Sequence, residues 1–333
     1  MKSFALQYPT VAAITLAGLI AVGCSHGGNA PETQRAAIQS SQENPGVPEP
    51  GQKLFASPEE AAAVLKDAVL TKDRPLLISI FGPEGRQLIL TGDRVEENHD
   101  LDAFGKRMTE YLRVDHPAAN MAVLYVGREN WPFPIPLMTS GGQWFFDTAA
   151  GKEELLNRRI GENELGAIAV CRAYVVAQRE YARKVRTDDG IMQYAQHFMS
   201  TPGKKDGLYW PVAAGEELSP MGPLVAEARE EGYPTTKPAN GKPRPYHGYY
   251  FRILTAQGDA APGGRMSYLA DGRLTKGFAL IASPSKWGAS GVMTFIVNQE
   301  GKVYQKNLGE STREIVRGVT EYNPDSSWEE VKD

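Results

Sequence analysis

The first half of the chain alternates short helical patterns with short strand patterns. Ser57-Pro58-Glu59-Glu60 has the form of a helix start, with a hydroxyl N-cap, proline at the first helical position and acids in the first turn. We therefore predict a helix from Pro58 to Leu70. The other elements predicted for this half are a short apolar segment at 76–81, a helix at 103–111 and strands at 121–126 and 143–146.

The second half begins with the longest helical pattern, at 162–184. Its apolar side chains recur every three or four positions and form a broad face, which is typical of a helix wrapped by other structure. Loops rich in Gly and Pro follow, around a short helix near 224–230. Strands are predicted at 249–255, 266–269, 278–282, 293–297 and 303–305, the last two as a hairpin.

These elements predict an α+β fold with two domains. A small N-terminal α+β domain is expected at 53–155. The second domain, at 156–333, is expected to pack one long helix on an antiparallel sheet. The segment 24–52 is polar, carries Gly, Pro and Gln and has no apolar period, so we expect a disordered tether there.

The N-terminus is typical of a secretory signal peptide. One cation, Lys2, precedes an apolar run from Val11 to Val22, which is too short to span a bilayer, because a spanning helix needs about 20 apolar residues. Ala21-Val22-Gly23-Cys24 resembles a lipobox, so we predict cleavage after residue 23 and lipidation of Cys24. An uncleaved anchor or an ordinary signal peptide is the alternative, since Ala21 stands where Leu is usual.

A signal peptide followed by a lipidated cysteine implies an envelope protein. Ser25 rather than Asp follows the lipidated cysteine, which by the usual sorting rule points to the outer membrane facing the periplasm. The lipid provides a membrane partner. Cleavage would change the formal net charge from −4 to −5 through loss of Lys2. A mildly acidic surface argues against a nucleic-acid partner.

Two short patterns suggest nucleophilic chemistry. Ser283-Pro284-Ser285-Lys286 fits the S-x-x-K pattern of serine acyltransferases, but the partner motifs are absent and the site follows a strand rather than opening a helix. Cys171 could be a thiol nucleophile, but it lies on the apolar face of a helix, where free cysteine usually packs as a small hydrophobe. We favour the structural interpretation for both.

The sequence does not predict a metal site or a cofactor. No two of the five histidines (His26, His99, His116, His197 and His247) have a metal-ligand spacing. Asp188 and Asp189 before Gly190 resemble the end of a calcium loop but lack the other oxygen ligands that calcium needs. A solvated turn is the favoured interpretation there. No phosphate loop or nucleophile elbow is present.

Two aromatic segments are candidate partner surfaces. Trp131-Pro132-Phe133-Pro134-Ile135-Pro136 must be extended and cannot lie in a central strand, because proline lacks an amide donor. Trp131 and Phe133 could form an exposed ledge, although packing onto the core is the favoured alternative. Tyr246, His247, Tyr249 and Tyr250 form the second candidate, where a hydrogen-bonded structural role for His247 outweighs catalysis.

Several strings resemble a known family. The segments at 131–136, 144–148, 157–161, 177–182, 245–250 and 290–298 are similar to the uncharacterised bacterial domain-of-unknown-function family 2950, from about residue 54 to the end. The family implies no activity. Asn163 to Tyr181 and the later strands also resemble the head domains of type IV pilins and pseudopilins. The apolar half of the pilin helix is missing, so such a head is not expected to polymerise by the usual helix packing.

The sequence therefore favours a lipid-anchored envelope protein that acts as a non-enzymatic binding or assembly module with an envelope protein partner. The alternative is a periplasmic hydrolase acting on peptidoglycan or peptide, which predicts a concave pocket where ionisable residues converge. The ligand, the oligomeric state and the pathway do not follow from the sequence.

Overall fold

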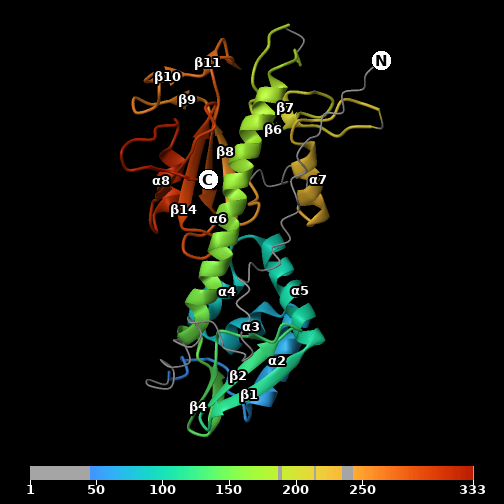
Figure 1. Ribbon diagram of the computed structural model, residues 1–333, viewed down its shortest axis with the longest axis vertical. Helices are drawn as coiled ribbons and strands as arrows, with labels where there is room; N and C mark the ends of the chain where they lie inside the picture. Colours follow the sequence, from blue (N-terminus) through green and yellow to red (C-terminus); the bar gives the residue numbers. More distant parts are fainter. Residues whose placement is uncertain (1–45, 187–189, 214, 235–242, 333) are drawn as a thin grey trace, which may run out of the picture.

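The computed structural model describes residues 46–186, 190–213, 215–234 and 243–332. It confirms the α+β fold class. Two lobes lie one above the other and share a single long helix that runs parallel to the long axis of the molecule (Figure 1). Within the described ranges, no helix combines the length and the apolar character needed to cross a membrane.

The lower lobe is the N-terminal domain. Its elements are α2 (Pro58–Leu70), α3 (Arg74–Phe81), the 3-10 turn η1 (Pro83–Gly85), α4 (Arg86–Ile89), α5 (Arg94–Glu110), β1 (Leu112–Ala118), β2 (Met121–Val126), β3 (Trp131–Pro132), β4 (Leu137–Ser140) and β5 (Gln143–Phe146). The strands form an antiparallel sheet in the order β1-β2-β4-β5, with β3 paired to β2. The helix predicted at 58–70 is confirmed, with the Ser57 hydroxyl accepting a hydrogen bond from the Glu60 amide at 3.1 Å.

The long helix is α6 (Thr148–Tyr181), of 34 residues. At a rise of 1.5 Å per residue it is about 50 Å long. Its predicted start near residue 162 is wrong, because the helix begins 14 residues earlier, in a stretch without a clear apolar stripe. The early turns form against the N-terminal domain, where the Thr148 hydroxyl donates to the Phe81 carbonyl at 2.8 Å and Gly151 contacts the Pro134 backbone too closely for a Cβ.

The same helix contributes to both apolar cores. Leu156 and Ile160 pack in the N-terminal core, whereas Ala167 and Cys171 pack in the C-terminal core. The expected domain boundary at 155/156 therefore falls inside α6, and the change from one core to the other lies between Ile160 and Ala167.

The upper lobe is the C-terminal domain. Its elements are β6 (His197–Met199), β7 (Gly207–Tyr209), α7 (Gly222–Glu230), β8 (Tyr249–Leu254), β9 (Ala256–Gln257), β10 (Met266–Ser267), β11 (Leu269–Ala270), β12 (Arg273–Leu274), β13 (Ala279–Pro284), β14 (Met293–Asn298), β15 (Val303–Asn307), α8 (Thr312–Gly318) and β16 (Glu329–Glu330). The main sheet is antiparallel in the order β16-β15-β14-β13-β8, and the second half of α6 packs against it. The hairpin predicted at 293–305 is confirmed by the pairing of β14 with β15.

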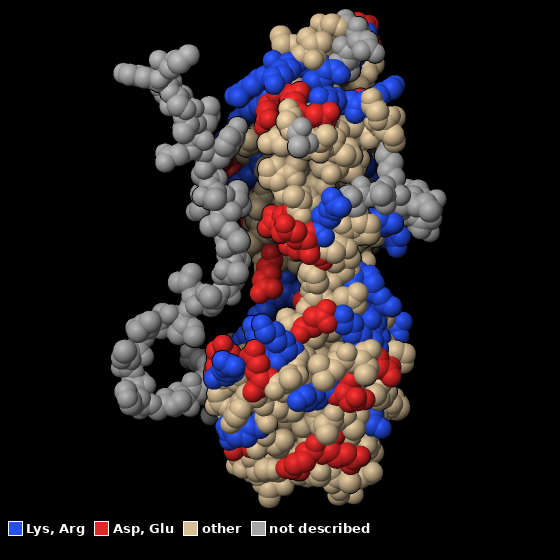
Figure 2. Space-filling view, turned by 90° about the vertical axis from the view of Figure 1, so that its right-hand side faces the viewer, with Lys and Arg blue, Asp and Glu red and all other residues tan. Residues whose placement is uncertain are grey.

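Charged residues are spread over the molecule. On the face that carries α5 and α7, acidic and basic side chains are interspersed on both lobes (Figure 2). This face therefore presents no uniform field of one sign, as a nucleic-acid-binding face would.

Candidate functional site

The start of α5 is the first part of a polar cluster between the two lobes. Asp93 is the N-cap, and its Oδ1 accepts hydrogen bonds from the amides of Val95 at 3.1 Å and Glu96 at 3.3 Å. These bonds satisfy amides that have no partner within the helix. Asp93 is only 1% exposed, although it begins a helix rich in charge.

The second carboxylate oxygen of Asp93 binds the C-terminal domain. Oδ2 accepts hydrogen bonds from the Tyr233 hydroxyl and from the Gly248 amide, both at 3.1 Å. Burial raises the pKa of Asp93, while the hydrogen bonds from Gly248, Glu96 and Tyr233 oppose that rise. One carboxylate thus caps a helix of one domain and holds a turn of the other.

That turn is a tight hairpin between Tyr246 and Tyr249, whose backbones exchange two hydrogen bonds. Its central residues His247 and Gly248 both have positive φ, at 45° and 69°, as a type I′ turn requires. A Cβ on Gly248 would lie 2.6 Å from Asn163 Nδ2. Only glycine therefore fits between α6 and the turn.

Glu96 extends the cluster to α6. Its Oε1 accepts a hydrogen bond from Asn163 Nδ2, and the same Nδ2 donates to the Ser290 carbonyl at 3.0 Å. Burial raises the pKa of Glu96 to about 7, with a smaller contribution from the nearby Asp100 carboxylate, against the hydrogen bond from Asn163. Near neutral pH this buried carboxyl is therefore partly protonated.

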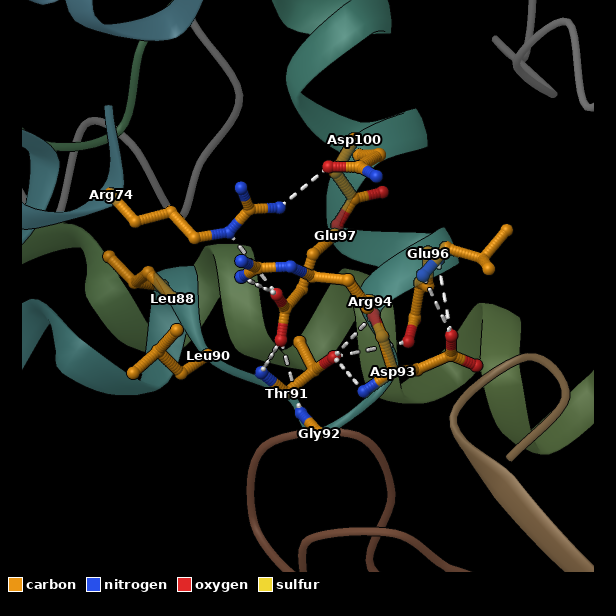
Figure 3. A network of polar contacts seen from close by, with 12 residues as sticks. Arg74, Leu88, Leu90, Thr91, Gly92, Asp93, Arg94, Glu96, Glu97 and Asp100 are labelled. Carbon is orange, nitrogen blue, oxygen red and sulfur yellow. Dashed lines mark hydrogen bonds and ion pairs between the residues drawn. The ribbon is translucent and has the colours of Figure 1, made fainter. Parts of the chain in front are cut away.

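Glu97 secures the loop that precedes α5. Figure 3 shows its carboxylate between the loop amides and two guanidinium groups. Oε1 accepts from the amides of Thr91 at 3.0 Å and Gly92 at 3.2 Å, and Oε2 lies 3.3 Å from Arg74 Nε and 3.4 Å from Arg94 Nη1. The loop at 90–93 is thereby fixed in the position from which it meets the C-terminal domain.

The turn after β13, in the C-terminal domain, completes the cluster. The Ser285 hydroxyl donates to the Thr91 carbonyl at 2.9 Å, and the Lys286 ammonium donates to the Leu90 carbonyl at 3.2 Å. Residues separated by more than 190 positions are thus joined directly. We name the set of Asp93, Glu96, Asn163, Tyr233, Gly248, Ser285 and Lys286 the junction cluster.

The junction cluster has the chemistry of a structural joint. Asp93 accepts hydrogen bonds from both domains, and Glu96 accepts one from Asn163 in α6. The oxygens of both carboxylates are therefore occupied by fixed protein donors. Buried carboxylates that are satisfied in this way contribute to the geometry of the fold, and losing one partner is costly.

Ser283 and Lys286 do not form the nucleophile arrangement that the S-x-x-K pattern suggested, which agrees with the favoured structural interpretation. Ser283 lies in β13 opposite Tyr250 and is 8% exposed. The Lys286 ammonium donates to the Leu90 carbonyl instead of to the Ser283 hydroxyl. The structural interpretation of Cys171 agrees with its place in the C-terminal core, where burial raises its pKa to about 12.

The candidate surface at Trp131 is part of the N-terminal core. Phe133 is 4% exposed and stacks on Phe104, with ring centroids 5.3 Å apart, while Trp131 is half-buried. The favoured interpretation, packing of this segment onto the core, agrees with this burial, and Phe133 does not form the alternative exposed ledge. The extended, edge position of the segment is confirmed, since β3 pairs with β2 alone.

The second candidate surface lies at the domain junction. Tyr249 is fully buried and its hydroxyl donates to the Met293 carbonyl at 2.9 Å, so its place on a partner surface is wrong. Tyr246, His247 and Tyr250 are half-buried. His247 Nε2 lies 3.0 Å from Glu231 Oε2, and its backbone amide donates to the Tyr233 hydroxyl.

Two predicted sites fall outside the described residues, namely the lipidation site Cys24 and the weak calcium candidate at Asp188 and Asp189. Elsewhere in the chain, within the ranges that the structure describes, no three His, Cys, Asp or Glu side chains gather where they could hold a metal ion.

The junction cluster was not predicted, although part of its signal is in the sequence. Asp93 followed three residues later by Glu96 has the form of a capping box, and it marks the true start of α5. The predicted start at residue 103 is wrong because charged residues dominate the first turns. The partners of Asp93 lie about 140 and 155 positions away, which no local pattern reveals.

The fold and the junction define a two-domain α+β protein built on one shared helix. The sequence profile of the protein family of unknown function DUF2950 matches residues 52–331, and the chain belongs to this family. No curated protein and no solved structure matches it. The resemblance to pilin head domains is therefore not confirmed and stays a prediction.

Proposed function

We propose that the protein is a lipid-anchored module of the bacterial envelope that binds or assembles with an envelope partner and catalyses no reaction. The proposed anchor is the lipidated Cys24 at the outer membrane, facing the periplasm. The resemblance of residues 21–24 to a lipobox and the apolar run before it support this anchor.

The observation that carries the proposal is that the buried polar groups of the junction are hydrogen-bonded to protein groups across it. Asp93, Glu96 and Lys286 are among the ionisable groups with shifted pKa values at the junction, and each is bonded to backbone or amide groups across it. Such groups stabilise one arrangement of the two lobes. A fixed arrangement of the two lobes suits a protein that presents a binding surface formed by both of them.

The alternative, an envelope hydrolase built on the S-x-x-K pattern, requires Ser283 and Lys286 in contact. Ser283 is the nucleophile that the sequence suggests, and its supposed base Lys286 is bonded to Leu90. Activation of a serine requires a base within hydrogen-bond reach. The binding role is therefore the better-supported proposal.

The test is crosslinking in the native membranes, followed by purification of the protein beside a Cys24→Ala control. We expect specific envelope proteins to co-purify with the lipidated form and to be lost or strongly reduced with the control. Recovery of the lipidated protein alone, or of the same partners with both forms, would contradict the proposal.

A further inference from the structure

A hollow of about 490 Å³ opens beside the junction cluster, and neither the fold nor the proposed function accounts for it. It is lined by the turn after β13, by Gln87 of the N-terminal domain and by residues at the start of α8. The volume lies in the range of small-ligand sites. Because both domains line it, the junction cluster sets its shape.

The lining of the hollow includes a cation, Lys286, that forms no ion pair within the described residues. Lys286 is partly buried, and its ammonium has the Leu90 carbonyl as hydrogen-bond acceptor at 3.2 Å. Among the described residues, no carboxylate lies within ion-pair distance of this ammonium. Burial lowers the pKa of Lys286, the nearby Arg86 lowers it further, and the Glu97 carboxylate opposes this shift. An ammonium has three donors, so donors remain for an anionic group in the hollow.

The wall formed by α8 carries both signs of charge. Arg313 is exposed and, within the described part of the chain, has no ion-pair partner, although Glu310 and Glu314 line the same hollow. A simple anion such as phosphate would meet these two carboxylates as well as the cations. The lining therefore matches a ligand that carries an anionic and a cationic group together.

Trp287 gives the hollow an aromatic surface held in one orientation. Its indole Nε1 donates to Asn307 Oδ1 at 3.0 Å, and the ring is partly exposed. An anchored indole with an open face provides apolar contact area at little entropic cost.

From this juxtaposition we propose that the hollow binds a short peptide bearing both a free carboxylate and a free amine. Lys286 and Arg313 receive the carboxylate, Glu310 and Glu314 receive the amine, and Trp287 contacts the intervening chain. This chemistry occurs in the stem peptide of peptidoglycan and in a protein C-terminus that carries a lysine, and the choice of the first source rests on the proposed envelope function.

The test is NMR titration of the full chain carrying Cys24→Ala and labelled at tryptophan, with Trp287→Phe assigning the Trp287 indole resonance. One probe is a disaccharide tetrapeptide that contains diaminopimelate, and the other is the N-acetylated linear peptide Ala-Gln-Lys-Ala, which likewise keeps one free amine and has a free carboxylate. We expect the Trp287 resonance to shift saturably. A shift with the first probe alone assigns the cell wall as source, and a shift with the linear peptide assigns any peptide of this charge pattern.

Variants test the proposed contacts. Lys286→Met and Arg313→Gln should each weaken binding at least about tenfold, whereas Lys276→Met, at an exposed lysine outside the hollow, should leave it unchanged. Arg313→Gln is informative even if Lys286→Met disturbs the junction, because Arg313 is exposed. No saturable shift with either probe, or full affinity in both variants, would overturn the inference.

This outcome is independent of the crosslinking result. Saturable peptide binding without envelope partners would refute the assembly proposal and support the proposed peptide site. Recovery of envelope partners without peptide binding would refute the proposed peptide site and leave the assembly proposal standing.

Discussion

Asp93 and Gly248 are 155 positions apart in the chain, and a hydrogen bond of 3.1 Å joins the carboxylate of one to the amide of the other. The same carboxylate caps α5. Because the bond crosses from one lobe to the other at a buried position, it couples the start of a helix in the N-terminal domain to a hairpin in the C-terminal domain.

Replacement of Asp93 should destabilise the protein more than loss of an ordinary helix cap. Asp93→Ala removes the cap, which is worth about 1 kcal/mol. It also leaves the Tyr233 hydroxyl and the Gly248 amide without an acceptor, at about 1–3 kcal/mol for a buried group. We expect a total loss of at least about 3 kcal/mol in the free energy of unfolding, measured by urea denaturation.

Asp73 provides the matched control, because it caps α3 through the Leu76 amide at 3.0 Å and lies away from the junction. Asp73→Ala should cost about 1 kcal/mol. Equal losses for the two variants would show that the bonds of Asp93 to the C-terminal domain contribute little.

Gly248 should not tolerate a side chain. Gly248→Ala places a Cβ 2.6 Å from Asn163 Nδ2 and 2.9 Å from Ser290 Cβ, at a φ of 69°. Gly264 has a similar φ of 73° and nothing within 4 Å of its Cβ position, so Gly264→Ala measures the backbone strain alone, about 1–2 kcal/mol. Thermal unfolding should show a larger loss of stability for Gly248→Ala than for Gly264→Ala. The reverse order would refute the close contact at Gly248.

Glu96 should make stability fall as the pH rises. Its pKa is raised from 4.5 to about 7 in the folded protein, so the folded state binds more protons than the unfolded state between these values. The contribution of Glu96 to stability is therefore fully present below about pH 4.5 and is lost as the pH rises through 7. At about 1.4 kcal/mol per unit, the upper limit is about 3 kcal/mol.

Glu96→Gln should remove this dependence, so that its stability relative to the parent protein increases from pH 5 to pH 8 in denaturation curves. Glu217 provides a control of opposite sign, because hydrogen bonds from Lys184 and Arg186 lower its pKa to about 2. Glu217→Gln should alter the stability difference in the acid range instead. A constant difference between parent and Glu96→Gln across pH 5–8 would mean that Glu96 does not titrate there.

Cys171 should be unreactive in the folded protein. It is fully buried in the C-terminal core, and burial raises its pKa to about 12, so thiolate is scarce at pH 8. In the Cys24→Ala protein, a thiol-specific disulfide reagent should label Cys171 only after denaturant is added. Rapid labelling without denaturant would place the thiol outside the core.

Much of the fold was predictable because it depends on local patterns. The helix at 58–70 has a complete start signal, and the strand at 121–126 is a continuous apolar run that became a buried strand. The start of α6 was not predictable, because Thr148 and Gly151 are held by contacts to Phe81 and Pro134 that exist only in the fold.

The junction cluster shows the same limit more strongly. The capping pair of Asp93 and Glu96 was visible in the sequence, but its burial and the pKa of Glu96 depend on Asn163 and on the hairpin at Gly248. Likewise, Ser283 and Lys286 matched a catalytic pattern, whereas the fold points the ammonium toward Leu90. A short motif could not reveal which acceptor lies nearest.

By its hydrogen bonds across the two lobes, the junction cluster joins the domains into one structural unit. Differential scanning calorimetry of the Cys24→Ala protein tests it most directly, alone and with Asp93→Ala added. We predict one cooperative unfolding transition for the first protein and two separated transitions, with the lower shifted downward, for the second. Two transitions in the first protein, or a single unshifted transition in the second, would contradict the claim.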